Sequence, residues 1–70
     1  MKLYELERGR WFRVKEKEGL SRERFQLEKI DGMYSRCLDV YGNLLHISAA
    51  APIQEVGDEE FPEEGHVEES

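Results

Sequence analysis

The sequence is poor in residues that build covalent or metal-held frameworks. It contains one cysteine, Cys37, in 70 residues. A single cysteine excludes an intramolecular disulfide and any multi-cysteine zinc or iron–sulfur site. No apolar run approaches the roughly 20 residues of a membrane helix, and the opening stretch MKLYELERGRWFRV lacks the apolar region of a secretory signal. We therefore expect a reduced, cytoplasmic protein without a membrane partner.

Nucleotide-binding and catalytic motifs are also missing. The six glycines occur singly along the chain, so neither G-x-G-x-x-G nor a Walker loop is present to hold phosphates. A chain of this size buries only about 60% of the surface that its unfolded form exposes. That leaves little room for an enclosed pocket lined by several catalytic groups. We therefore expect a protein that is not an enzyme and uses no cofactor.

Positive charge is absent from one end of the chain. Residues 57–70, GDEEFPEEGHVEES, carry seven acids and neither Lys nor Arg, whereas residues 1–56 carry all ten Lys and Arg against nine acids. Only Phe61 and Val67 in this tail are apolar, so burial cannot offset its ordering entropy. We predict one domain over 1–56 and a disordered acidic tail over 57–70. The tail is either a solvated segment or a cover for a basic patch on its own domain.

Short runs of alternating apolar and polar residues are what the sequence has instead. Such runs, separated by turn signals, are typical of β-strands, and the strongest turn signals here surround Gly32 and Gly42. A polar loop is expected over 17–23, with Leu20 turned inward, and a turn over 49–52. The pattern predicts an all-β fold, a small SH3-like, partly open barrel. Its five or six short strands are expected at 2–6, 10–16, 24–30, 33–40, 44–48 and 53–56.

The two turns decide which side chains face solvent. If both are three-residue loops with glycine in the left-handed bulge position, Lys29 pairs with Met33 and Asp39 with Asn43. A two-residue loop would instead turn Arg36 inward, which is costly without a partner, so we prefer the first register. Its inner rows are Phe25, Cys37 and Leu45, then Leu27, Ser35 and Ile47. Its outer row is Gln26, Arg36 and His46, with Tyr34 beside Glu28.

The preferred register leaves two apolar residues on the outer face. Leu38 and Leu44 point away from the core, so the tail or a bent strand end has to cover them. The same register separates the residues of a conceivable thiol nucleophile, because Cys37 points inward while His46 points outward. Activation requires the imidazole within hydrogen-bond reach of the sulfur. We therefore expect no catalytic dyad from Cys37, Asp39 and His46.

Basic and aromatic residues on the expected outer face form the candidate binding surface. Trp, Tyr and Arg are enriched in protein-binding hot spots. The same side chains could stack and pair a single-stranded nucleic acid, but a domain of net charge +1 lacks a basic footprint. Trp11 could also close one open end of the barrel under the 2–6 segment. No metal is expected, since His46, His66 and the tail carboxylates have no known ligand spacing. The predicted surface comprises Trp11, Arg13, Tyr34, Arg36 and His46.

The stretch KIDGMYSRCLDVYGNLLHISAA, with LERGRWFRV upstream, resembles small uncharacterised β proteins of tailed bacteriophages and prophages. The likeness covers residues 3 to about 56 and rests on a D-G-M-Y-S turn, a G-N turn and an apolar-His-apolar strand. It implies an accessory protein in a bacterial cytoplasm that binds a host protein, and it assigns no site residue. We expect a non-enzymatic interaction module, monomeric or weakly dimeric, with a host or phage protein as partner. The alternative is a weak single-strand nucleic-acid binder with the tail as its inhibitor.

Overall fold

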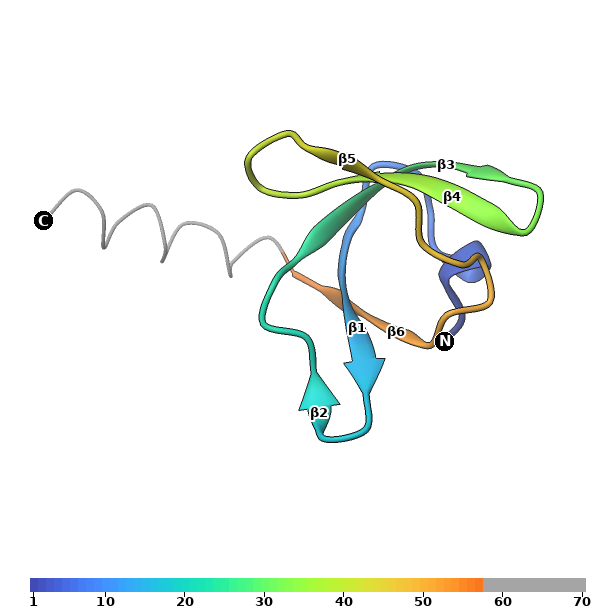
Figure 1. Cartoon of the computed structure of the whole chain (residues 1–70). Helices are drawn as coiled ribbons and strands as arrows, with labels where there is room; N and C mark the ends of the chain where they lie inside the picture. The colour runs from blue at the N-terminus through green and yellow to red at the C-terminus, as the bar shows by residue number, and fades with distance from the viewer. Residues whose placement is uncertain (58–70) are drawn as a thin grey trace, which may run out of the picture.

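The computed structural model describes residues 1–57. One 3₁₀ turn precedes six strands in this range (Figure 1): η1 (Leu3–Glu5), β1 (Trp11–Glu16), β2 (Gly19–Leu20), β3 (Phe25–Asp31), β4 (Tyr34–Leu38), β5 (Leu44–Leu45) and β6 (Ile53–Val56). The prediction of an all-β, partly open barrel is confirmed. The predicted disordered tail, apart from Gly57, lies outside the described residues. No helix of residues 1–57 has the length and apolar character to cross a membrane.

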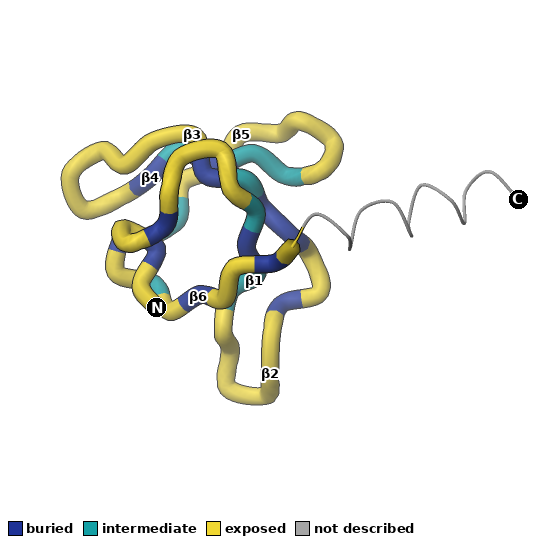
Figure 2. Tube along the Cα trace, turned by 180° about the vertical axis from the view of Figure 1, so that it is seen from behind, coloured by how far each residue is buried: buried dark blue, intermediate teal, exposed yellow. Residues whose placement is uncertain are grey.

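β1 is the strand around which the sheet is organised. It pairs antiparallel with β2, β3 and β6, and β3 leads on through β4 to β5. The sheet curls so that β6 and β5 lie on opposite sides of a common interior (Figure 1). The buried segments line that interior, whereas the loops between strands are exposed (Figure 2).

The core is small and draws its side chains from most of the elements. The Phe12 and Phe25 rings from β1 and β3 pack with centroids 5.8 Å apart and a 45° tilt, within the range that aromatic pairs favour. Around them lie the other buried members of the cluster, Leu3, Leu6, Leu27, Cys37 and Ile53.

The expected strand over residues 2–6 is wrong, and the segment forms η1 instead. Leu3 and Leu6 are three residues apart, so a 3₁₀ turn places both side chains on one side. There they close one end of the barrel, and both are buried. The backbone N–H groups of Leu3 and Tyr4 donate to the carbonyls of Ala51 and Ala49, each at 2.9 Å. Leu3 and Leu6 therefore take the place in which Trp11 was considered.

The expected three-residue loop at Gly32 is also wrong. Asp31 pairs directly with Tyr34, so the loop has two residues, and Gly32 has φ +65°, as the first loop position of a type II′ turn requires. The register then shifts between Leu27 and Lys29, which leaves Glu28 as an extra residue in a β-bulge. The bulge reverses the effect of the shorter loop. Leu27, rather than Phe25, therefore pairs with Cys37.

The second hairpin matches its prediction. Cys37 pairs with Leu45 and Leu38 with Leu44, and Gly42, at φ +86°, donates to the Asp39 carbonyl at 3.0 Å. The Asp39 carboxylate accepts hydrogen bonds from the N–H groups of Tyr41 (2.9 Å) and Asn43 (2.8 Å) and from Asn43 Nδ2 (3.1 Å). These bonds, the one from the Asn43 backbone first, hold the pKa of Asp39 below its ordinary value despite a smaller opposing effect of desolvation.

Two other segments differ from expectation. Leu20 is exposed in β2, and Ser21 is buried in its place, because its hydroxyl accepts from Val14 N at 2.9 Å and donates to Glu23 O at 2.8 Å. β5 ends at Leu45 rather than at residue 48. Beyond it, the buried Ser35 hydroxyl of β4 donates to the Ile47 carbonyl at 2.8 Å and replaces a main-chain ladder bond.

We expect the stability of the second hairpin to depend on pH through Asp39. Because its pKa is depressed in the folded state, the carboxylate contributes stability above the unfolded pKa, and this is lost as pH falls through the folded pKa. The unfolding free energies of the wild type and Asp39→Asn should differ at neutral pH and converge below about pH 4. Urea denaturation across this range measures the difference. Asp31→Asn is the matched control for loss of one charge, and a gap unchanged by pH would contradict the assignment.

Candidate interaction surface

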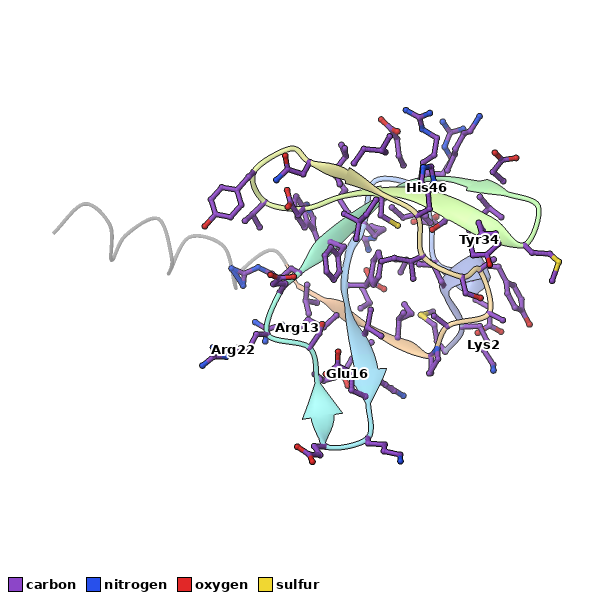
Figure 3. All side chains as sticks on the ribbon, in the orientation of Figure 1. Lys2, Arg13, Glu16, Arg22, Tyr34 and His46 are labelled. Carbon is purple, nitrogen blue, oxygen red and sulfur yellow. The ribbon has the colours of Figure 1, made fainter. Side chains whose placement is uncertain are left out.

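The five predicted surface residues lie on the outer face of the sheet in two groups. Tyr34 and Arg36 are on β4, and the β4–β5 register places His46 directly opposite Arg36. Trp11 and Arg13 are on β1, on the far side of β3. Figure 3 shows Tyr34 and His46 along β4 and β5, whereas Arg13 lies near β2. The structure therefore joins Tyr34, Arg36 and His46 and places the other two on a separate part of the same curved face.

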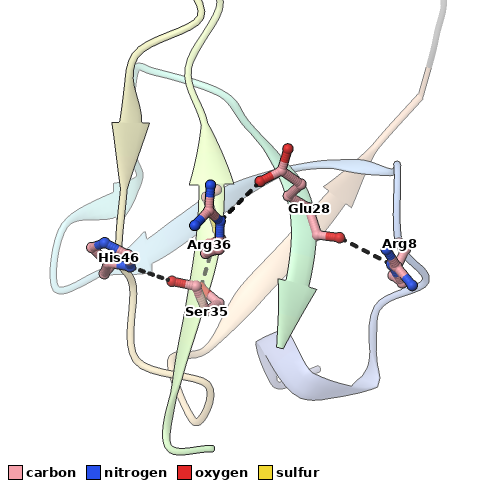
Figure 4. Close-up of polar contacts among 6 residues, drawn as sticks. Arg8, Glu28, Ser35, Arg36 and His46 are labelled. Atoms are coloured by element: carbon pink, nitrogen blue, oxygen red, sulfur yellow. Dashed lines mark hydrogen bonds and ion pairs between the residues drawn. The ribbon is translucent and has the colours of Figure 1, made fainter. Parts of the chain in front are cut away.

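Glu28, the bulged residue of β3, is the centre of the polar contacts on this face. Its carboxylate accepts a hydrogen bond from Arg36 Nε at 3.1 Å, and its backbone carbonyl accepts one from Arg8 Nε at 3.0 Å (Figure 4). The Arg36–Glu28 ion pair is half-exposed, so it contributes little to stability. Its effect is positional, because it holds the planar Arg36 guanidinium along the sheet surface with its other nitrogens available to an acceptor.

A shallow cleft of about 310 Å³ lies beside the bulge. The N–H of Gly9 donates to the Leu27 carbonyl at 2.7 Å, and Leu27 N donates to the Arg10 carbonyl at 3.0 Å, so the 7–10 loop runs along β3 here. Gln26 Nε2 donates to the Gly9 carbonyl at 3.0 Å. The cleft combines a guanidinium, an amide and an apolar side chain; its lining residues are Arg8, Gly9, Gln26, Leu27, Glu28 and Leu38.

Exposed apolar side chains gather at the same end of the fold. Nine large hydrophobic residues are exposed, and five of them lie between residues 33 and 44. They occupy β4, the first residue of β5 and the two adjoining loops, and they are Met33, Tyr34, Val40, Tyr41 and Leu44. Met33 and Tyr41 are the most exposed, at 81% and 85%. Clustered exposed apolar residues mark interaction sites, whereas single ones need no explanation.

Cys37 and His46 have the opposite orientations expected of them. Cys37 is fully buried, and its Sγ lies 3.1 Å from the Ser35 hydroxyl. Burial raises the pKa of the Cys37 thiol more than this hydrogen bond lowers it. His46 is exposed, and its Nδ1 lies 3.1 Å from the backbone carbonyl of Ser35 (Figure 4). The thiol is thus on the inner face and the imidazole on the outer face of the same pair of strands.

Within residues 1–57, no three His, Cys, Asp or Glu side chains are grouped so that they could hold a metal ion. His66 and the tail carboxylates, also considered as ligands, lie outside the described residues. Arg8, Gln26 and Leu38 are the surface residues that the sequence analysis did not assign. Arg8 belongs to the basic run before β1, but only the bulge brings it to Glu28, and no local pattern in the sequence indicates that bulge.

The buried Cys37 thiol should be nearly inert in the folded protein. A thiol reagent attacks the thiolate, which both the raised pKa and the covering residues suppress. We expect the reaction with a chromogenic disulfide to be at least about a hundredfold slower in native buffer than in denaturant, because it requires local opening. Cys37→Ser gives the background signal. Rapid native reaction would contradict the buried orientation and restore Cys37 as a candidate nucleophile.

Comparison with known proteins gives no relative from which a function could be transferred. No family model matches the chain, no curated protein matches it, and no solved structure matches it. The outer face therefore has to be interpreted from its own chemistry.

Proposed function

We propose that this chain is a non-enzymatic interaction module that binds a protein through the outer face of β4 and β5. The binding surface comprises Tyr34, Arg36, His46 and Leu44, together with the adjoining loops. We further propose that the barrel is SH3-like and that the protein is an accessory factor of a phage or prophage, acting on a host protein in the bacterial cytoplasm. The last two points rest on strand order and on the sequence resemblance, respectively.

The clustering of exposed apolar residues between positions 33 and 44 is the observation that carries the proposal. A sheet face in contact only with water would be expected to carry polar side chains at these positions. Here Tyr34 is 59% exposed and Leu44 46% exposed, on strands whose opposite face is already used by the core. Burial of such side chains by a partner contributes about 25 cal/mol per Å² of apolar surface.

Arg36 and His46 add direction to this apolar surface. Arg36 is fixed by Glu28 on one side and is flanked on β5 by His46, whose ring is held by the Ser35 carbonyl. A positioned guanidinium next to an exposed tyrosine is typical of binding hot spots, because both groups lose little conformational entropy on binding. The surface is therefore suited to a partner segment with an apolar side chain next to a carboxylate.

A single-stranded nucleic acid is the alternative ligand. Lys29, Arg36 and His46 lie on the same outer face as Tyr34, an arrangement that could pair phosphates and stack a base. The described residues nevertheless carry nine acids against ten Lys and Arg, which is weak attraction for a polyanion. We therefore favour the protein partner and treat nucleic acid as an outcome of the test.

Alanine substitution on this surface provides the test. Full-length protein is immobilised, exposed to bacterial lysate, and the proteins retained by the wild type are identified and then bound individually. Tyr34→Ala and Leu44→Ala should each weaken that binding by about 2 kcal/mol, or about thirtyfold, as hot-spot truncations do. Leu20→Ser, on exposed β2 at the far end of the fold, is the matched control and should leave the affinity unchanged.

Equal binding by the wild type and both β4–β5 variants would overturn the assignment. A signal that disappears on nuclease treatment and falls steeply with salt would instead identify nucleic acid as the ligand, since binding to phosphates releases counterions. Circular dichroism of each variant checks that the fold is retained.

A further inference from the structure

A row of mainly apolar side chains crosses the whole outer face of the sheet. Trp11 pairs with Val56 on one side and with Gln26 on the other, Gln26 pairs with Leu38, and Leu38 pairs with Leu44. Directly paired residues point to the same face, and Phe12, next to Trp11, points into the core. We call these five residues the outer row: Val56, Trp11, Gln26, Leu38 and Leu44.

The members of the outer row are covered to very different extents. Val56 is only 6% exposed although it is not part of the core cluster, whereas Leu44 is 46% exposed. Trp11 and Leu38 lie between these extremes. The row therefore begins buried at the end of β6 and becomes more exposed toward β5.

Arginines border the outer row on both sides. Arg36 and the cleft residue Arg8 lie on the side of the β3 bulge. On the other side, Arg13 is two residues from Trp11, and extending the β1–β3 register by one pair brings Arg24 opposite Arg13. Arg24 is only 5% exposed. Two guanidinium groups on one partly buried patch repel each other, so the patch favours carboxylates.

The chain itself continues into a segment of complementary composition. β6 ends at Val56, the first member of the outer row. The residues that follow Gly57 read DEEFPEE, an aromatic residue and a proline with acids on both sides. An apolar centre between acidic flanks matches an apolar row between arginine borders.

We propose that residues 58–64 fold back across the outer row of their own chain, with Phe61 on the apolar residues and the flanking acids at the arginines. The segment thus acts as an internal cover for the outer face. This also accounts for Leu38 and Leu44, which the sheet alone leaves without cover.

The distances allow this path. Neighbouring strands are about 4.8 Å apart, so Leu38, three strands from Val56, is about 14 Å away along the sheet surface. Phe61 follows Val56 by five residues, and an extended chain covers about 16 Å in five residues. Phe61 therefore reaches the row between Gln26 and Leu38, and no long loop is needed.

The only tryptophan of the chain lies in the outer row, so its fluorescence reports on the cover. In the full-length protein, Phe61→Ala should shift Trp11 emission to longer wavelength and raise the acrylamide quenching constant about twofold, as the population with Trp11 covered falls. Val67→Ala, which removes the other apolar residue of the tail, is the matched control and should leave both quantities at wild-type values.

Charge provides a second, independent readout. Raising the salt concentration from 0.1 M to 1 M shortens the Debye length from about 10 Å to about 3 Å, so wild-type quenching should rise toward that of Phe61→Ala. Replacing Asp58, Glu59 and Glu60 by their amides should have the same effect at low salt, whereas Glu68→Gln with Glu69→Gln should not.

Three results would overturn the proposal. Quenching of Phe61→Ala equal to the wild type would show that Phe61 does not cover Trp11. Equal effects of Phe61→Ala and Val67→Ala would remove the specificity for residues 58–64. Wild-type quenching that decreases with protein concentration would assign the cover to a second copy. The inferred control of partner access rests on the proposed function, but these measurements involve no partner, so either proposal can fail while the other stands.

Discussion

The extra residue that Glu28 adds to β3 is the constraint on which both faces of the sheet depend. The two-residue turn at Gly32 alone would point Arg36 and Leu38 inward and Cys37 outward. The bulge reverses that parity over the half of the hairpin next to the core. Arg8 and Arg36 hold the bulged residue by its carbonyl and its carboxylate. Core packing and surface chemistry therefore both depend on one unpaired position.

The two hairpins show what sequence reasoning can and cannot determine. The loop from Asp39 to Asn43 is stabilised by its own residues, a left-handed glycine and a carboxylate that caps the turn, so local sequence was enough to predict it. The bulge in β3 depends on the 7–10 loop alongside it, about twenty residues earlier in the chain. Alternation was also ambiguous at residues 2–6, since Leu3 and Leu6 fit a 3₁₀ turn with closure of the barrel end as well as they fit a strand.

The candidate surface was predicted in composition but not in arrangement. Strand parity correctly placed Tyr34, Arg36 and His46 outside the barrel and Cys37 inside. It did not show how far the curl of the sheet separates these residues from Trp11 and Arg13, nor that Trp11 and Leu38 share a row. Cross-strand neighbours depend on register, and register was the quantity that the bulge changed.

The short free edge of β5 has a consequence for self-association. An exposed strand edge is a template on which another chain can add main-chain hydrogen bonds. After Leu45 the β5 segment leaves the regular ladder, and the Ser35 hydroxyl, a side-chain group, bonds Ile47 instead. Only two residues of regular strand are presented at that edge. A domain with this much apolar surface on its outer face is thereby protected from growing into extended sheets, because its edge is too short to nucleate them.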